Sequence, residues 1–512
     1  SKASFKPSSR NVKGIDGVLE THSGELHTYQ VKFRSREEKL TWNECVGSVA
    51  ASTEADALLV FTNVEEIDGD IKKRNVYSIR HDFLSALTSN DFQKIENLFY
   101  AAAIEPKKII DLEHYQENSV QSVLDLLKTE KRAQVIMPCG SGKTIVGQRI
   151  IEGMENANVI LILVPTLQLL NDTFEDYIKN TTWKTFPYIC VGSKVLDASS
   201  HDQIDLDTED LPFVSCTDPK PIKKFLDRKS DTKIVFSTYQ SLPVFAKALG
   251  SNHVDVAIFD EAHNTASKKG NYWSFGLEDK NIKINKRIFL TATPRKFHLL
   301  RKNEDAMRSV FSMDDPNTYG QIAYQLTFKK AAYEYEVICK YKIIISVINS
   351  DYYTNEDLKS AGVLVGYSEV NAETIAKQIA LLDAVKKNEI KKIISFHPKI
   401  SHASEFVGEK EKSIRHRLDG FSFYTISSKQ SAGDRRVNMR SFRNSENALI
   451  SNAQCLNEGV DVPAVDMVAF MHPKRSTISI VQAVGRAIRK PRGSNKEWGY
   501  VFVPIFLEKN KK

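Results

Sequence analysis

The chain has 512 residues, of which 41% are hydrophobic and 26% are charged, and its net charge is +7. At roughly 100–200 residues per domain this length predicts about three globular domains, and the modest positive charge permits a polyanionic partner without requiring one. Six scattered cysteines without CxxC spacing exclude a disulfide framework and a cysteine-rich zinc site, and no apolar run is long enough to cross a membrane, so we expect a cytoplasmic protein without membrane association.

The first predicted unit covers residues 1–104 and opens with "GIDGVLETHSGELHTYQVKFR" at residues 14–34. This stretch is typical of two strands joined by a tight turn. A helical pattern over residues 42–54 and an apolar strand over residues 57–63 follow. Together they predict a small α/β unit.

Polar side chains share one face of the second strand of this hairpin. Because side chains alternate along a strand, Gln30 and Lys32 lie on the same face, and we expect Val31 to face the core instead. A three-residue loop at residues 22–24 would place Asp16 opposite Gln30. A two-residue loop would place Asp16 opposite Val31, on the wrong face for a shared site.

In the favourable register, these side chains would form a site for phosphodiester cleavage. Asp16 would bind Mg²⁺ or Mn²⁺ with help from the Gln30 side-chain oxygen, and Lys32 would position the attacking water. Gln in place of a carboxylate removes one negative charge from the site. Glu20 lies an even number of residues from Asp16, on the same face of the strand, and would compensate as a second metal ligand. The alternative is an ordinary hairpin with polar residues on its exposed face.

Two longer series of strands and helices follow, at residues 105–302 and 341–512, with a connection at residues 303–340. Their strands are runs of Val, Ile and Leu without alternation, such as "VILILVP" and "KKIISFH", and such runs suit parallel sheets covered on both faces. The sequence therefore predicts an α/β chain with two tandem parallel-sheet domains after the small N-terminal unit.

The strongest motif is "MPCGSGKT", which lies between a predicted strand and a predicted helix. Gly140, Ser141 and Gly142 would let backbone N–H groups turn toward phosphate oxygens at the start of the helix. Lys143 would reach the β- and γ-phosphates of ATP, and Thr144 would ligate Mg²⁺ through its hydroxyl.

A pair of acids ends the predicted strand in "AIFDEAH". Ligands bind at the carboxyl ends of strands in open α/β sheets. We expect Asp260 to hold Mg²⁺ and Glu261 to orient or deprotonate the attacking water.

Two arginines lie three residues apart in "QAVGRAIR" of the last predicted domain. This spacing places Arg486 and Arg489 on one face of a helix. They would stabilise charge on the transferring phosphoryl group from across a domain interface, as an arginine finger does. An ordinary basic helix face is the alternative.

These motifs, in this order, resemble those of superfamily 2 helicases and translocases over about residues 111–507. "LEHYQENSVQ" resembles the adenine-reading Q motif, with Gln116, and "NAQCLNEGVDVP" resembles motif V, with Gly459 and Asp461 at the nucleotide. "VPTLQLL", "STYQS" and "TAT" are similar to further motifs of the family. The resemblance implies two RecA-like domains that clamp ATP and make sequence-tolerant contacts to the backbone of DNA.

The opening hairpin resembles the Mrr-like branch of the PD-(D/E)xK nucleases, in which Gln is a recurrent variant at the position of Gln30. Nuclease and motor together resemble the front half of type ISP restriction enzymes. No NPPY-type methyltransferase motif is present, so methyltransferase and target-recognition parts would lie on a longer chain or a partner subunit. The resemblance implies an ATP-dependent DNA translocase coupled to a metal-dependent endonuclease, in restriction or anti-phage defence. The alternatives are a motor with a non-cleaving DNA- or protein-binding module, and an RNA helicase or remodeller.

Overall fold

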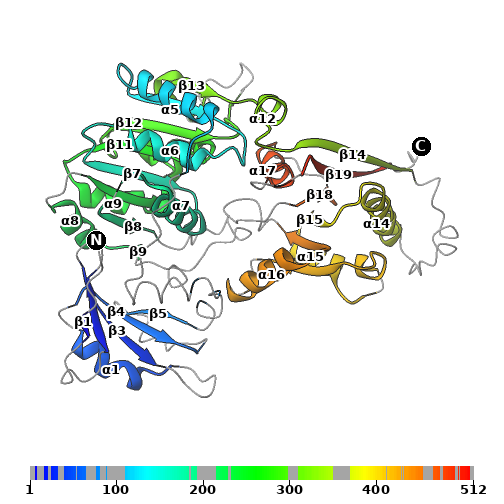
Figure 1. Ribbon diagram of the computed structural model, residues 1–512, viewed down its shortest axis with the longest axis horizontal. Helices are drawn as coiled ribbons and strands as arrows, with labels where there is room; N and C mark the ends of the chain where they lie inside the picture. The colour runs from blue at the N-terminus through cyan, green and yellow to red at the C-terminus, as the bar shows by residue number, and fades with distance from the viewer. Residues whose placement is uncertain are drawn as a thin grey trace.

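Three β-sheets, one in each of three successive parts of the chain, organise the described residues of the computed structural model (Figure 1). The structure describes residues 6–7, 16–20, 25–32, 40–52, 55–64, 76–80, 83, 88, 91, 110–183, 186–192, 215–228, 232–297, 310–349, 369–410, 412–427, 429–430, 432–453, 465–472, 477–490, 494 and 496–507. The α/β class and the order of a small unit before two larger parallel-sheet domains are as the sequence predicts.

The N-terminal sheet, blue in Figure 1, has its strands in sequence order. They are β1 (Lys6–Pro7), β2 (Gly17–Glu20), β3 (Leu26–Lys32), β4 (Ala57–Thr62) and β5 (Val76–Ile79), with helix α1 (Trp42–Ala51) between β3 and β4. The first three strands pair antiparallel, and β3, β4 and β5 pair in parallel. Leu58 and Val60 of β4 pack in one core with Cys45 of α1, so the helix covers the face from which these residues project.

The second sheet has eight parallel strands in the order β13-β6-β12-β11-β7-β10-β8-β9. They are β6 (Arg132–Ile136), β7 (Val159–Val164), β8 (Tyr188–Val191), β9 (Ser215–Cys216), β10 (Lys233–Thr238), β11 (Val254–Phe259), β12 (Ile284–Thr291) and β13 (Gln321–Gln325). Ile162 and Leu163 of β7 enter different hydrophobic cores and are both buried, because helices cover both faces. Strand β13 comes from the predicted connection at residues 303–340, part of which therefore belongs to this sheet.

Capping residues set the starts of several helices in this domain. The Thr166 hydroxyl accepts a hydrogen bond from the Leu169 N–H at 3.2 Å, and Asp218 accepts one from the Lys220 N–H at 2.9 Å. The α-helices are α5 (His114–Leu126), α6 (Lys143–Glu152), α7 (Leu167–Asn180), α8 (Pro219–Leu226), α9 (Leu242–Leu249), α11 (Pro316–Tyr319) and α12 (Phe328–Tyr333). Three 3₁₀ turns are η3 (Tyr239–Ser241), η4 (Ala262–Thr265) and η5 (Tyr272–Leu277).

The third sheet has six parallel strands in the order β14-β19-β18-β15-β17-β16. They are β14 (Lys340–Asn349), β15 (Lys392–His397), β16 (Ser422–Ile426), β17 (Ala448–Ala453), β18 (Met467–Phe470) and β19 (Trp498–Leu507). Its helices are α14 (Glu369–Lys387), α15 (Ile400–Val407), η6 (Ile414–His416), α16 (Ala432–Asn444) and α17 (Thr477–Ala487).

The second and third sheets are joined where the chain enters β14. The Cys339 N–H donates to the Ile488 carbonyl at 2.7 Å, which ties the interdomain connection to the residue after α17. No helix in the described ranges is long and apolar enough to span a bilayer.

Candidate active site

The glycine-rich loop predicted to bind phosphate lies between β6 and α6, as expected. Gly140 and Gly142 have φ angles of +85° and +82°, in the left-handed region that favours glycine. Helix α6 begins at Lys143, and no side chain caps its first turn at Gly142. The N–H groups at a helix start attract anions, so this loop fits a phosphate group.

Lys143 lies inside this loop. Its Nζ atom is 3.5 Å from the Pro138 carbonyl oxygen. Burial alone would lower the pKa of Lys143, but the neighbouring Cys139 and Glu261 groups raise it above the ordinary value. The ammonium group therefore stays charged, as a phosphate ligand must. Thr144 follows it in the first turn of α6 and is half-buried.

Helix α5 holds the loop from the other side. Gln116 donates from Nε2 to the Ser141 carbonyl at 3.1 Å, and its Oε1 accepts from the Glu113 N–H at 3.0 Å. The Tyr115 hydroxyl donates to the same Ser141 carbonyl at 2.8 Å. Gln116 therefore lies at the loop as predicted. Tyr115, its neighbour, is a contact that no pattern in the sequence indicates.

The two acids follow β11 at the carboxyl edge of the same sheet. The Asp260 carboxylate accepts from the Glu261 N–H at 2.9 Å. Glu261 has a φ angle of +46°, an unusual conformation for a residue with a side chain. Its carboxylate lies 3.3 Å from Nδ1 of His263, which is also 3.1 Å from the Thr291 hydroxyl. The acid pair is thus connected through His263 to the "TAT" segment at the end of β12.

The two carboxyl groups differ in pKa. Burial, together with the charge of Glu261, raises the pKa of Asp260 to about 6. Burial would also raise that of Glu261, but its hydrogen bond with His263 and the charge of Lys143 lower its pKa to about 2. Glu261 is consequently ionised at neutral pH. Two neighbouring carboxylates supply the kind of oxygen donor that suits Mg²⁺.

The end of α17 in the last domain packs against the phosphate loop. A Cβ atom built on Gly485 would lie 2.7 Å from Cβ of Cys139, and Cγ of Arg489 is 3.8 Å from the position of a Cβ on Gly140. Arg486 is buried, and its charge contributes to lowering the pKa of Glu261. Both predicted arginines therefore lie at the interface that carries the loop and the acids. The predicted common helix face is wrong, because α17 ends at Ala487 and the backbone of Arg489 pairs with Ile338 instead.

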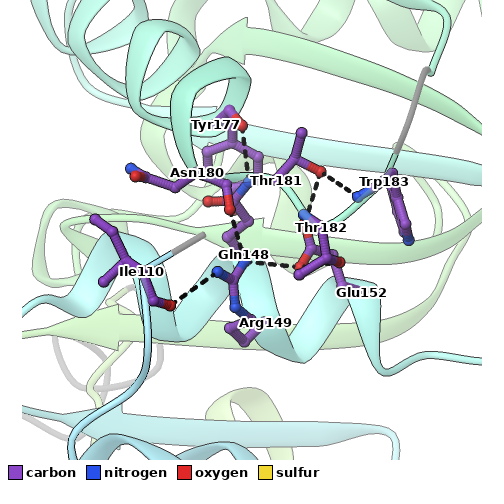
Figure 2. A network of polar contacts seen from close by, with 9 residues as sticks. All are labelled: Ile110, Gln148, Arg149, Glu152, Tyr177, Asn180, Thr181, Thr182 and Trp183. Carbon is purple, nitrogen blue, oxygen red and sulfur yellow. Dashed lines mark hydrogen bonds and ion pairs between the residues drawn. The ribbon is translucent and has the colours of Figure 1, made fainter. Parts of the chain in front are cut away.

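Behind the loop, a polar network joins the far end of α6 to the end of α7 (Figure 2). Arg149 pairs with Glu152 at 2.8 Å and donates to the carbonyl oxygens of Asn180 at 3.0 Å and Ile110 at 3.3 Å. Gln148 donates to the Tyr177 carbonyl at 2.8 Å. The helix that starts with Lys143 is thus fixed at both ends.

The N-terminal hairpin has the register of a three-residue loop. Gly17 lies opposite Tyr29 and Glu20 opposite Leu26, and the paired stretch ends at Gly17, one residue after Asp16. The Asp16 N–H donates to the Tyr29 carbonyl at 2.8 Å, and the exposed Asp16 carboxylate accepts from the Val31 N–H at 2.6 Å.

The expected faces of β3 are wrong. Gln30 is buried, with 8% of its surface exposed, and its Oε1 accepts from the Ser48 hydroxyl of α1, whereas Val31 is 46% exposed. The reason is that β4 directs Leu58 and Val60 toward α1, and Gln30 pairs with Val60 on that same face. Lys32 lies two residues after Gln30, on the same face of β3, and is half-buried.

The donor set that the structure shows at this hairpin does not fit a metal ion. Among the residues with described side chains, Asp16 is the one carboxylate of the predicted set, and the Gln30 oxygen is used by Ser48. No cluster of three or more His, Cys, Asp or Glu side chains suited to a metal occurs in the described ranges. The Glu20 side chain, Gly459 and Asp461 lie outside the described part of the chain.

Two family models match the chain. The model of the type III restriction enzyme res subunit matches residues 109–296, and the helicase conserved C-terminal domain matches residues 375–491. The first match contains the phosphate loop and the acid pair, and the second contains Arg486 and Arg489.

Curated relatives are distant and mostly longer. A probable helicase from African swine fever virus is 25% identical over 443 residues, which is 83% of this chain and 45% of that protein. The DNA 3'-5' translocase XPB2 of Sulfurisphaera tokodaii is 24% identical over 411 residues, covering 75% of this chain and 80% of that protein. This chain spans less than half the length of the African swine fever virus relatives.

Solved structures share the fold. The ATP-dependent Type ISP restriction-modification enzyme LlaBIII bound to DNA aligns with a TM-score of 0.77 at 24% identity, over 99% of this chain and 36% of that one. A nuclease-deletion mutant of the Type ISP enzyme LlaGI in complex with a DNA substrate mimic aligns with a TM-score of 0.54 at 24% identity, over 78% of this chain and 27% of that one. The second and third sheets therefore have the fold of two paired RecA-like domains, and the chain is similar to the motor parts of restriction enzymes.

Proposed function

We propose that the chain is an ATP-driven DNA translocase. The observation that carries this proposal is the convergence of the phosphate loop, the acid pair, Arg486 and Arg489 at one interface between two parallel-sheet domains. ATP bound there would contact both domains, so its binding and hydrolysis would change their separation. Alternate closing and opening would shift the contacts that each domain makes with the nucleic-acid backbone.

Each residue has a distinct part in hydrolysis. Lys143 would bind the β- and γ-phosphates, and the ionised Glu261 would accept a proton from the attacking water. Arg486 and Arg489 would stabilise charge on the phosphoryl group from the second domain. Thr144 and Asp260 would hold Mg²⁺, which would neutralise phosphate charge when bound. Gly459 and Asp461 would complete the nucleotide site.

DNA is the nucleic acid that we propose as the track. XPB2 is a DNA translocase by name, and both type ISP structures contain DNA or a DNA mimic. The net charge of +7 is compatible with contacts to phosphates. Such contacts read little sequence and weaken with salt.

The test is an ATPase assay with duplex DNA, single-stranded DNA and RNA, on the parent and on Lys143→Ala. We expect duplex DNA to stimulate hydrolysis by the parent, with a stimulation that falls steeply between low and physiological salt. Lys143→Ala should be inactive. Stimulation by RNA alone would instead support an RNA helicase or remodeller.

We also propose that the first 104 residues are the nuclease unit of this machine, in restriction or anti-phage defence. The intact type ISP enzyme covers 99% of this chain and the nuclease-deletion mutant covers 78%. The difference is about a fifth of the chain, which is the share of residues 1–104. The second support is that Asp16 lies beside β3, where its carboxylate accepts from the Val31 N–H, with Lys32 on the same strand.

Cleavage of duplex DNA with ATP and either Mg²⁺ or Mn²⁺ tests this second proposal. We expect ATP-dependent nicking that Lys32→Ala abolishes while leaving the ATPase intact. Full ATPase activity without cleavage in either metal would make the unit a non-cleaving DNA- or protein-binding module. In cells, protection against phage infection should require Lys143.

A further inference from the structure

The stretch after α17, which carries Arg489, is held by a partly buried lysine. Nζ of Lys496 lies 2.6 Å from the Val465 carbonyl oxygen and 3.4 Å from the Arg489 carbonyl oxygen, and it also donates to the Ala487 carbonyl. An ammonium group has three N–H donors, so these contacts use all of them. Ala487 ends α17, where unpaired carbonyls and the helix dipole favour a cation.

Two other elements hold the same backbone. The Cys339 N–H donates to the Ile488 carbonyl at 2.7 Å, and Sγ of Cys339 lies 3.8 Å from the Arg489 carbonyl oxygen. On another side, a Cβ on Gly499 would lie 2.5 Å from the Ala487 carbonyl oxygen, so the start of β19 passes directly against it. The stretch is therefore fixed between the interdomain connection, β19 and Lys496.

The backbone of residues 487–489, which these contacts hold, borders the proposed ATP site. Cγ of Arg489 lies 3.8 Å from the position of a Cβ on Gly140, and the position of a Cβ on Gly485 lies 2.7 Å from Cβ of Cys139. At both glycines a side chain would meet the other domain, so the backbones of the two domains lie close together and have little room to move. A displacement of about 1 Å at a catalytic group can cost roughly 100-fold in rate.

We propose that Lys496 is a positioning residue for ATP hydrolysis. Its ammonium group fixes the backbone of residues 487–489 and thereby directs Arg486 and Arg489 toward the phosphate loop. Lys496 acts through main-chain oxygens and not on the nucleotide, so its loss affects the rate of turnover more than the binding of ATP. This inference rests on the proposed ATPase function for its kinetic readout.

Lys392 provides a matched control in the same domain. Its Nζ donates to the carbonyl oxygens of Phe442 at 3.2 Å and Arg443 at 2.5 Å, at the end of α16. Lys392 therefore binds the last turn of a helix as Lys496 does, but at the start of β15 and not at the phosphate loop. Lys392→Met controls for the loss of a helix-capping cation.

The experiment compares Lys496→Met, Lys496→Arg and Lys392→Met in DNA-stimulated ATPase assays. We expect Lys496→Met to lower kcat by about 10- to 100-fold, with the KM for ATP changed by less than about threefold. Lys496→Arg keeps the donors and should recover part of the rate. Lys392→Met should lose thermal stability and keep its kcat. Equal losses of kcat in the two Met variants would overturn the proposal.

A double-mutant cycle separates positioning from a general effect. In an Arg489→Ala background, Lys496→Met should lower kcat by a clearly smaller factor than it does in the parent, because one of the two groups that it positions is absent. If kcat of the double variant falls by the product of the two single-variant factors, Lys496 acts independently of Arg489, and this result would overturn the proposal.

A thiol-labelling assay gives a readout that needs no turnover. Burial raises the pKa of the Cys139 thiol, which lies against Gly485, so its alkylation by N-ethylmaleimide should be slow in the parent. We expect faster alkylation in Lys496→Met and not in Lys392→Met, measured by peptide mass spectrometry. Faster alkylation in a protein that hydrolyses no ATP would support the positioning and refute the ATPase proposal. Unchanged alkylation with unchanged kcat would refute the positioning.

Discussion

Two ion pairs with the same helical spacing differ mainly in burial. Asp125 near the end of α5 and Lys128 just beyond that helix lie 2.6 Å apart, with side chains 52% and 72% exposed. Arg149 and Glu152 of α6 lie 2.8 Å apart, with side chains 10% and 6% exposed. A ranking by distance would make the surface pair the stronger one. Solvent screens an exposed pair, whereas a buried charge that loses its partner stays out of water, so burial should decide the cost of breaking each pair.

Glu152 also anchors the end of α7 (Figure 2). Its Oε1 accepts from the Thr181 hydroxyl at 2.7 Å and the Thr182 N–H at 2.9 Å, and its Oε2 accepts from the Thr182 hydroxyl at 2.8 Å and from Arg149. Glu152→Gln keeps the size of the side chain but leaves the Arg149 charge uncompensated and turns an N–H₂ group toward donors. Breaking such a buried pair costs about 3–5 kcal/mol.

The assay is thermal unfolding of the parent, Glu152→Gln and Asp125→Asn, with hydrogen exchange to identify the domain that unfolds. At roughly 2–4 °C per kcal/mol for a domain of this size, Glu152→Gln should lower the midpoint of the first RecA-like domain by about 6–20 °C. Asp125→Asn should leave it unchanged. Equal shifts in the two variants, or a larger shift in Asp125→Asn, would refute the argument that burial decides.

Three further changes test the loop, a turn and a buried histidine. Gly142→Ala would place a Cβ 2.4 Å from Nε2 of Gln116 at a φ of +82°, so ATP affinity in equilibrium dialysis should fall by about tenfold or more. Gly320→Ala would place a Cβ 2.2 Å from the Arg132 carbonyl oxygen at a φ of +74°, and should cost about 2 kcal/mol or more in denaturant unfolding. Burial and two neighbouring histidines lower the pKa of His397 to about 3, so it stays neutral when folded and takes up a proton only on unfolding. Stability should therefore fall by about 2 kcal/mol from pH 7 to pH 5 through this group, and His397→Gln should flatten the pH profile.

The parts of the candidate site that the sequence predicts are those encoded locally. A buried strand, a glycine-rich turn and a helix start occur within one short stretch, so the place of Lys143 follows from its neighbours. Asp260 directly follows β11, and β11 is separated from β6 by β12 alone. The carboxyl ends of parallel strands meet at one edge of a sheet. Local pattern and sheet topology together were enough to bring these two residues to one site.

The contacts across the two domains depend on distant segments and could not be predicted in the same way. Cys139 against Gly485, and Lys496 at the end of α17, join residues whose neighbours in sequence give no sign of the contact. The motif predicts that Arg489 matters, because its residue type and spacing suit phosphate chemistry. It does not predict which groups hold Arg489, because those come from the packing of β14 and β19 around it.

The hairpin shows a further limit of sequence patterns. Alternation along β3 predicts that Gln30 and Lys32 share a face. A three-residue loop predicts the register of β2 and β3, which the structure has from Gly17 opposite Tyr29 to Glu20 opposite Leu26. Alternation along one strand does not determine which face of the sheet a helix covers. Here the apolar residues of β4 determine that α1 covers the face that carries Gln30. Gln30 consequently lies under α1 against Ser48, where its amide already has a structural partner. A nuclease unit that cleaves DNA would therefore have to release Gln30 from Ser48 or obtain its metal ligands from other residues. The cleavage assay, and not the motif, is consequently the decisive evidence for this part of the chain.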